Sequence, residues 1–218
     1  FGLVGAGRTE ICKAIFGADK FDSGKIFING KEEHIKNPRS AMKKGVALLP
    51  EDRKKEGLCL GLSVDFNTNM ASYDLISKFC WINLKKEHER TRHYIKEMET
   101  KTPSIKQLCK NLSGGNQQKV VIGKWLCRNA DIMIFDEPTV GVDVGAKAEI
   151  YKLIEQLTRQ GKCIILISSY LPEIMGLADE MMVISEGKLM GTLDRSEFMK
   201  DGKLDEERAL RLASGISE

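Results

Sequence analysis

Short apolar runs alternate with amphipathic stretches along the chain. Three runs, each bounded by polar residues, have the length of buried strands and lie at residues 46–50, 131–138 and 162–169. The stretches 8–17 and 145–161 carry apolar side chains at helical spacing, and each ends on a glycine that suits a helix C-cap. Strands that alternate with helices predict an α/β fold built on a mostly parallel sheet.

Shorter elements complete the predicted core. Residues 23–31 read as a strand closed by an Asn-Gly turn, and residues 37–45 as a short helix with Pro38 at its first position. Residues 180–193 predict a strand, a turn with the sequence SEGK and a second strand. The tail, from residue 204 to residue 218, predicts a charged helix.

From about residue 51 to residue 110 the pattern becomes more polar. A loop-like stretch is followed by two predicted helices with polar faces, at residues 63–79 and 84–100. This change predicts a helical lobe inserted in the α/β core. We expect a single domain over residues 1–218, with the lobe and the helix after it at about 51–125 and the core at 1–50 and 126–218.

Composition narrows the class of protein. Apolar residues make up 42% of the chain and charged residues 30%, as in ordinary soluble globular domains. A net charge of +3, with acids and bases mixed, offers no electrostatic footprint for nucleic acid. No apolar run approaches the roughly 20 residues that span a bilayer, so we expect any role at a membrane to depend on a partner. The six cysteines show no CxxC spacing and are expected to be free thiols.

The first ten residues, FGLVGAGRTE, have the spacing of a phosphate-binding loop. The backbone of such a loop, here Gly2, Gly5, Ala6 and Gly7, turns its N–H groups toward a phosphate at the N-terminus of the next helix. Thr9 is placed to ligate Mg²⁺, but Arg8 stands where lysine is usual, and its planar guanidinium is not equivalent to a compact ammonium group. A plain glycine-rich turn is the alternative interpretation.

Only Phe1 precedes this loop, whereas a phosphate-binding loop normally follows a buried strand. We therefore expect that the sequence is a fragment and that N-terminal strands are missing from it.

Two further motifs follow along the chain. In LSGGNQQK, at residues 112–119, Ser113 and two glycines precede a helix and could bind an anion, or could form an ordinary helix cap. In IMIFDEPTVGVD, at residues 132–143, an apolar strand ends in two adjacent carboxylates. Because successive strand residues point to opposite sides, Asp136 can hold Mg²⁺ while Glu137 polarises an attacking water.

The order of these motifs resembles that of the ATP-binding-cassette (ABC) ATPases, and the resemblance covers essentially the whole chain. Five segments are more narrowly similar to the second half of the tandem ATPase subunit of bacterial ribose, galactose and xylose importers: GLVGAGRTE, LLPEDRKKEGL, NLSGGNQQKVVIGKWL, DEPTVGVDVGAK and ISSYLPEI. The resemblance implies a P-loop NTPase fold with ATP and Mg²⁺ as cofactors. It implies as partners a sibling N-terminal cassette, membrane permease subunits and, indirectly, a sugar-binding protein, at the cytoplasmic side of the membrane.

In the resembled family, two cassettes close head to tail over two ATP molecules, and each pocket borrows the LSGG signature of the other cassette. The groups lent outward are kept here as Ser113, Gly114, Gly115 and Gln117, with Asn116 where glutamine is commoner. The resemblance also places Asp143 among the nucleotide-binding residues.

The residues that belong to this chain's own nucleotide pocket depart from the family pattern. The loop lysine is Arg8, the glutamine expected after the third strand is Glu51, and the switch histidine is Ser169, which is too short to replace an imidazole. The resemblance therefore implies a signature donor with a degenerate pocket of its own. The alternatives are a self-sufficient ATPase in which Arg8 does the work of lysine, and a cassette protein that acts outside transport.

The resemblance also implies that the helical lobe and residues 51–70 meet a helix of the permease. Four apolar residues of this stretch are candidate contacts, or else pack the lobe's own core: Leu58, Leu60, Leu62 and Phe66.

Overall fold

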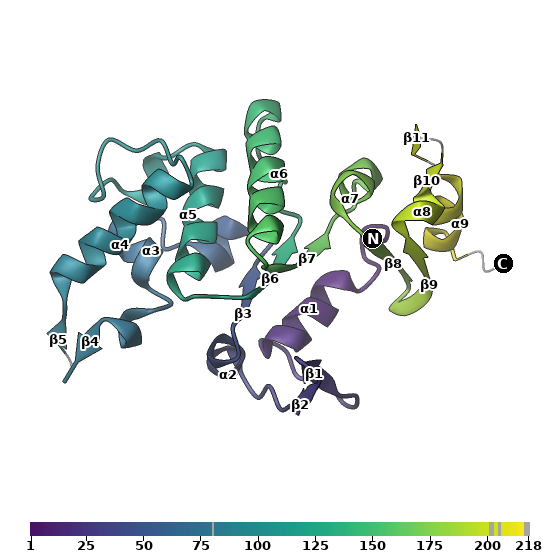
Figure 1. Ribbon diagram of the computed structural model, residues 1–218, viewed down its shortest axis with the longest axis horizontal. Coiled ribbons are helices and arrows are strands. Elements are labelled where there is room, and N and C mark those ends of the chain that lie inside the picture. The colour runs from purple at the N-terminus through teal and green to yellow at the C-terminus, as the bar shows by residue number, and fades with distance from the viewer. Residues whose placement is uncertain (80, 201–202, 205, 216–218) are drawn as a thin grey trace.

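A three-stranded parallel sheet forms the centre of the molecule in this computed structural model, which describes residues 1–79, 81–200, 203–204 and 206–215. Its order is β3 (Val46–Leu49), β6 (Ile132–Asp136) and β7 (Cys163–Ile167). Val46 pairs with Ile132, which in turn pairs with Cys163, so the three carboxyl ends lie at one edge. The three apolar runs therefore form parallel strands, as predicted (Figure 1).

Helices pack on this sheet and close the main core. α1 (Arg8–Phe16) and α2 (Pro38–Lys43) contact β3, while α6 (Val144–Arg159) contacts β7. Large side chains that are fully buried in this core come from the sheet, from α6 and from α5, and include Leu49, Phe135, Ile150, Leu157 and Ile122. The predicted helix start at Pro38 is confirmed. Pro38 is the first residue of α2, and Asn37 and Ser40 form reciprocal capping hydrogen bonds there.

The helical lobe inserted between β3 and β6 lies at one end of the molecule (Figure 1). It contains, in order, η1 (Arg53–Gly57), α3 (Val64–Asn69), η2 (Tyr73–Leu75), the hairpin strands β4 (Ser77–Lys78) and β5 (Trp81–Ile82), α4 (Leu84–Glu97), η3 (Cys109–Asn111) and α5 (Gly114–Cys127). The helix predicted at 84–100 is confirmed as α4.

The single helix predicted over residues 63–79 is wrong, because α3 ends at Asn69. The Asn69 amide donates to the Asp65 carbonyl and to Thr91 of α4, while Ser72 N–H donates back to the Asn69 carbonyl. Side-chain amides that bond to backbone carbonyls compete with helix continuation, and the chain turns into the β4–β5 hairpin instead.

The candidate permease contacts in this lobe divide into buried and exposed residues. Leu58 is buried in the main core, and Leu60 packs against it. Leu62 is exposed and Phe66 half-buried. Leu58 is therefore a core residue rather than a surface contact, and Leu62 alone of the four is freely exposed.

A second, smaller core lies at the opposite end of the molecule (Figure 1). It joins α7 (Leu171–Leu177), the antiparallel strands β8 (Glu180–Ser185) and β9 (Lys188–Asp194), α8 (Arg195–Phe198) and α9 (Glu207–Ala213). Phe1 belongs to this core and bonds through its backbone to Met182 and Ile184 of β8. The predicted strand–turn–strand at 180–193 is confirmed, and the predicted tail helix is α9, although residues 205 and 216–218 lie outside the described structure.

The remaining elements are two short hairpins. β1 (Ile26–Ile28) and β2 (Lys31–Glu33) pair around the predicted Asn-Gly turn, and β10 (Met199–Lys200) pairs with β11 (Lys203–Leu204). Five of the six cysteines are free thiols, as expected, while Cys80 lies outside the described residues. Among the residues that the structure describes, no helix combines the length and apolarity needed to cross a bilayer.

The two predicted C-terminal glycines differ in their surroundings and offer a test of the fold. Both have positive φ, but a Cβ at Gly17 would lie 2.8 Å from Ile35 and 2.9 Å from the Asn37 backbone, whereas nothing lies within 4 Å at Gly161. We expect Gly161→Ala to cost about 1 kcal/mol for backbone strain alone and Gly17→Ala clearly more, as measured by urea unfolding. Equal losses would show that the contact between Gly17 and the segment before α2 does not constrain the fold.

Candidate functional site

The opening loop folds as a turn that ends at a helix N-terminus. Gly5 and Gly7 have positive φ, and α1 begins at Arg8 without a side-chain cap, so the first N–H groups of the helix remain available to an anion. Gly187 in the β8–β9 turn donates its N–H to the Ala6 carbonyl, and a Cβ at Gly2 would lie 2.3 Å from the Ile184 carbonyl oxygen. The loop is thus fixed against the β8–β9 hairpin.

Arg8 points from this loop to the carboxylate that follows β6. Its Nη1 lies 3.5 Å from Oε1 of Glu137, and both side chains are only about a tenth exposed. The same Glu137 oxygen accepts a 2.7 Å hydrogen bond from the Ser169 N–H. Glu137 also adopts φ 44°, a strained conformation for a residue with a side chain. The catalytic candidate is therefore held between an arginine and the switch position.

Asp136 is the better candidate for a metal ligand. It is buried at the end of β6, it is hydrogen-bonded by Thr9, and its Oδ1 is a buried acceptor without a partner. Burial raises the pKa of Asp136, and the negative charges of Glu51 and Glu137 raise it further. An orphaned carboxylate oxygen beside a threonine hydroxyl fits the oxygen ligands that Mg²⁺ prefers.

A buried hydrogen bond next to the switch position could not be predicted from the sequence. Ser168, just before Ser169, is fully buried and donates a 2.5 Å hydrogen bond to Oε2 of Glu173. Burial raises the pKa of Glu173, whereas its hydrogen bonds with Ser168, Thr139 and Tyr151 act in the opposite direction. A glutamate in the segment LPEI gave no signal of this, because a single acid in a helix is usually solvated.

The signature segment belongs to a different part of the surface. Ser113 is exposed at the start of α5, and its Oγ accepts a hydrogen bond from Asn116, whose own oxygen accepts one from the Lys101 N–H. A Cβ on Gly114 would lie 2.7 Å from Arg53, and a Cβ on Gly115 would lie 2.6 Å from that of Ala146. The two glycines are therefore required by packing within this chain, independently of any phosphate.

The other predicted nucleotide-binding residues also have partners within the chain. Gln117 is buried, and its amide donates to the Cys109 and Leu112 carbonyls. Asp143 is exposed and caps α6 by accepting a hydrogen bond from the Ala146 N–H. These contacts account for both residues structurally, and their role in binding nucleotide stays a prediction.

Two buried basic side chains connect the segment after β3 to both motifs, and no sequence pattern indicates their burial. Arg53 donates to the carbonyls of Val140 and Gly141, between Glu137 and α6. Lys124 of α5 donates to the Gly57 carbonyl at 2.8 Å and lies over the Trp125 ring. The segment that begins at Glu51 is thus attached both to the loop after β6 and to the signature helix.

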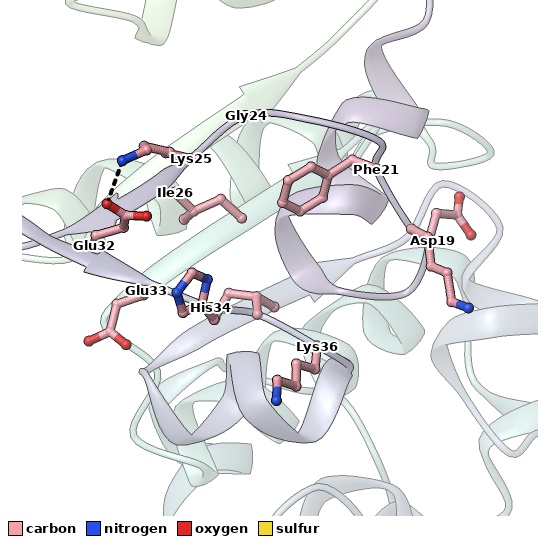
Figure 2. A pocket seen from close by; sticks show the side chains of 11 residues that line it. Asp19, Phe21, Gly24, Lys25, Ile26, Glu32, Glu33, His34 and Lys36 are labelled. Carbon is pink, nitrogen blue, oxygen red and sulfur yellow. Dashed lines mark hydrogen bonds and ion pairs between the residues drawn. The ribbon is translucent and has the colours of Figure 1, made fainter.

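A cavity of about 430 Å³ lies elsewhere, between the loop after α1 and the β1–β2 hairpin (Figure 2). Figure 2 shows Phe21 and Ile26 beside it and the 2.9 Å ion pair of Lys25 and Glu32 at its rim. Charged side chains of both signs line it, and none of the predicted site residues does. It is therefore separate from the phosphate loop.

Comparison with protein families decides the assignment. The model of the ABC transporter family matches residues 1–140, which include the phosphate loop, the signature and the carboxylates after β6. The chain belongs to the ABC transporter family. The matched range includes the glycine-rich opening, whose role as a phosphate-binding loop stays a prediction.

Curated relatives narrow the comparison to sugar import. The chain is 47% identical over 215 residues to a "Putative ribose/galactose/methyl galactoside import ATP-binding protein 1" from Agrobacterium fabrum, covering 98% of this chain and 41% of the relative. It is 50% identical over 203 residues to a "Ribose import ATP-binding protein" from Clostridium tetani, covering 92% of this chain and 40% of the relative. The chain therefore spans about two fifths of the length of these relatives.

Solved structures confirm the P-loop NTPase fold of the ABC type. The ADP conformation of an ATP-binding cassette has a TM-score of 0.77 at 21% identity, over 99% of this chain and 86% of that one. A cassette bound to ADP and phosphate has a TM-score of 0.71 at 17% identity, over 89% of this chain and 83% of that one. The ATP and Mg²⁺ predicted from the sequence are the cofactors of this family.

Lys124 generates a prediction about pH. Burial lowers its pKa from the ordinary 10.5 to about 8, so between these values the unfolded chain holds a proton that the folded chain does not. The free energy of unfolding should then rise with pH across this window, by up to about 3 kcal/mol from this group. We expect this rise in the difference between the wild type and Lys124→Met, which removes the contribution of the other titrating groups. A difference that stays flat between pH 8 and 10 would contradict the burial of a titrating amine.

Proposed function

We propose that this chain is a nucleotide-binding cassette of a bacterial importer for sugars of the ribose, galactose and xylose class. The names of the curated relatives support this substrate class, and the ABC transporter match supports ATP as the bound nucleotide. Such a cassette works at the cytoplasmic face of the membrane, together with permease subunits and, indirectly, a sugar-binding protein. ATP hydrolysis supplies the energy for transport, which follows from the closure of two cassettes over the nucleotide.

The chain's own pocket is proposed to be degenerate, and one observation carries this proposal. Arg8 lies 3.5 Å from Glu137, with both side chains largely buried, so the carboxylate that should polarise water faces a guanidinium. The Ser169 N–H occupies the same oxygen of Glu137. An oxygen that already faces the guanidinium and accepts the Ser169 N–H is poorly available to an attacking water, which lowers the rate of hydrolysis at this pocket.

The signature is proposed to serve a sibling cassette instead. Ser113 is exposed, and its neighbours Gly114 and Gly115 contact Arg53 and Ala146 rather than the phosphate loop. The N-terminus of α5 is therefore directed at a ligand held by another chain or domain. A sibling N-terminal cassette is the partner that this arrangement fits.

Magnesium binding at the chain's own pocket is retained in the proposal. Asp136 and Thr9 would hold the ion, which supplies charge neutralisation of the phosphates when it is bound. The partnerless Oδ1 of Asp136 and the adjacent threonine hydroxyl support this placement. The pocket would thus bind Mg²⁺–nucleotide and turn it over slowly.

The same retained groups favour a second candidate function, a self-sufficient ATPase. Asp136, Glu137 and Thr9 are all in place, and in this alternative Arg8 would swing away from Glu137 to meet the phosphates. The two candidates differ in which of the chain's own residues limit turnover.

We expect the two functions to separate in the complete subunit, reconstituted with its permease and assayed for ATP hydrolysis. Ser113→Ala should lower turnover by roughly a hundredfold, because it removes a hydroxyl donor to the sibling's nucleotide. Glu137→Gln should change turnover by less than about twofold, because this side chain is already engaged by Arg8 and the Ser169 N–H. Ser104→Ala, another exposed serine of the lobe, is the matched control and should leave the rate unchanged.

The reverse ranking, with Glu137→Gln severe and Ser113→Ala mild, would establish the self-sufficient ATPase. Comparable large losses from both variants would show two working pockets and would contradict the degenerate one.

A histidine at the switch position tests whether this chain's own pocket contributes to the ATP turnover of the complete subunit. Ser169→His should alter the ATP turnover of the complete subunit by less than about threefold, since the Arg8–Glu137 contact remains in place. A gain or loss of tenfold or more would show that position 169 governs hydrolysis in the wild type. Thermal unfolding of the variant serves as the control for misfolding.

A further inference from the structure

An exposed apolar cluster projects from the outer end of the helical lobe. It is formed by residues of the β4–β5 hairpin, which lies at the end of the lobe in Figure 1, and by residues on either side of the hairpin. Phe79 is 86% exposed and Trp81 82%, which is far more than large aromatic side chains usually show on a protein surface. We call this cluster the aromatic tip, and its members are Leu75, Phe79, Trp81, Ile82 and Leu84, all of them exposed.

Within the segment that carries the aromatic tip the charged residues have one sign, and the first exposed acid on its C-terminal side is Glu89 of α4. Residues 75–86 contain three lysines, Lys78, Lys85 and Lys86, and no acidic residue. The acids at the two borders are engaged: Asp74 pairs with Arg128, and Glu87 is buried and accepts a hydrogen bond from Tyr73. The tip is therefore apolar at its centre and positive at its margin.

The placement of these lysines is not explained by helix stability. Lys85 and Lys86 lie in the first turn of α4, where the positive end of the helix dipole disfavours basic side chains. Lys78 stands directly opposite Trp81 in the hairpin, so a basic and an aromatic side chain share one face. Their common feature is proximity to exposed aromatic and aliphatic surface.

Exposed aromatic side chains with lysines beside them suit the interface region of a lipid bilayer. Tryptophan rings settle at the level of the headgroups, aliphatic side chains reach the upper acyl region, and lysines meet anionic phosphates.

We propose that the aromatic tip inserts into the interface of an anionic membrane. This gives the lobe a direct lipid contact, in contrast to the expectation that any membrane role depends on a partner protein. The members of the aromatic tip are distinct from the residues of the phosphate loop and from the two carboxylates after β6. In an importer it would orient the lobe toward the bilayer that holds the permease.

Vesicle binding of the purified protein tests this proposal. We expect flotation with vesicles that contain about a third phosphatidylglycerol and a phosphatidylcholine remainder, and binding weaker by about a hundredfold to pure phosphatidylcholine, since each basic group near the surface contributes on the order of fivefold. Raising the salt from about 0.05 M to 0.5 M should weaken binding in the same direction. The fluorescence of Trp81 should shift to the blue on binding, while that of Trp125 is already buried and should not respond.

Matched variants locate the contact. Phe79→Ser with Trp81→Ser should weaken vesicle binding by about tenfold or more, through loss of the inserted surface. Val144→Ser, at an equally exposed valine on α6, should leave it within about twofold. Lys85→Glu with Lys86→Glu should weaken it as strongly as the double serine variant, whereas Lys110→Glu, elsewhere on the lobe, should have a much smaller effect. Circular dichroism confirms that each variant is folded.

Three results would overturn the proposal. The first is absence of wild-type binding to anionic vesicles, or equal binding by the tip variants. The second is self-association without lipid that the same variants abolish, which would assign the tip to a second copy of the chain. The third is binding confined to vesicles that carry permease subunits, which would assign the tip to a protein partner.

Discussion

The central place of β6 in the parallel sheet is the constraint on which the site depends. β6 is hydrogen-bonded to β3 on one side and to β7 on the other, so its last residue cannot shift without breaking a ladder. Asp136 is held there in a buried setting, and Glu137 follows with a strained backbone whose N–H bonds to the Ile167 carbonyl. Both carboxylates are thus fixed in place, and the groups that contact Glu137 are the Arg8 guanidinium and the Ser169 N–H.

The same constraint explains how distant motifs are coupled. The segment after β3 starts at the sheet edge beside Asp136 and continues through Arg53, which bonds to the loop after Glu137, and Gly57, which bonds to Lys124 of the signature helix. Burying a guanidinium and an amine is costly unless each meets carbonyl acceptors, as both do here. A displacement of this segment would therefore shift both the loop that follows the carboxylates and helix α5. These hydrogen bonds connect the lobe physically to the pocket.

Much of this could be predicted from the sequence, and the failures have physical reasons. The three strands, α4, α6 and the glycine C-caps follow from local periodicity, and the phosphate loop and paired carboxylates follow from spacing. The break after Asn69 depends on an amide that reaches Thr91 on another helix, and the Arg8–Glu137 contact joins residues far apart in the chain. The burial of Glu173, Arg53 and Lys124 is likewise a tertiary property, because residues of these types are usually solvated and nothing local marks these three.

The glycines of the signature show why a motif alone is ambiguous evidence for function. Gly114 and Gly115 lack space for a Cβ because of Arg53 and Ala146, so packing within this chain would preserve them even if no phosphate were ever bound. Ser113 differs from these glycines because its residue is exposed. Its hydroxyl accepts a hydrogen bond from the Asn116 amide. Ser113 occupies the N-cap of α5 but makes no side-chain cap hydrogen bond, so its hydroxyl does not stabilise the helix in the usual way and is available to a ligand outside the chain. The case for signature donation therefore depends on the serine and on the engaged Glu137, and not on the glycines that make the motif recognisable.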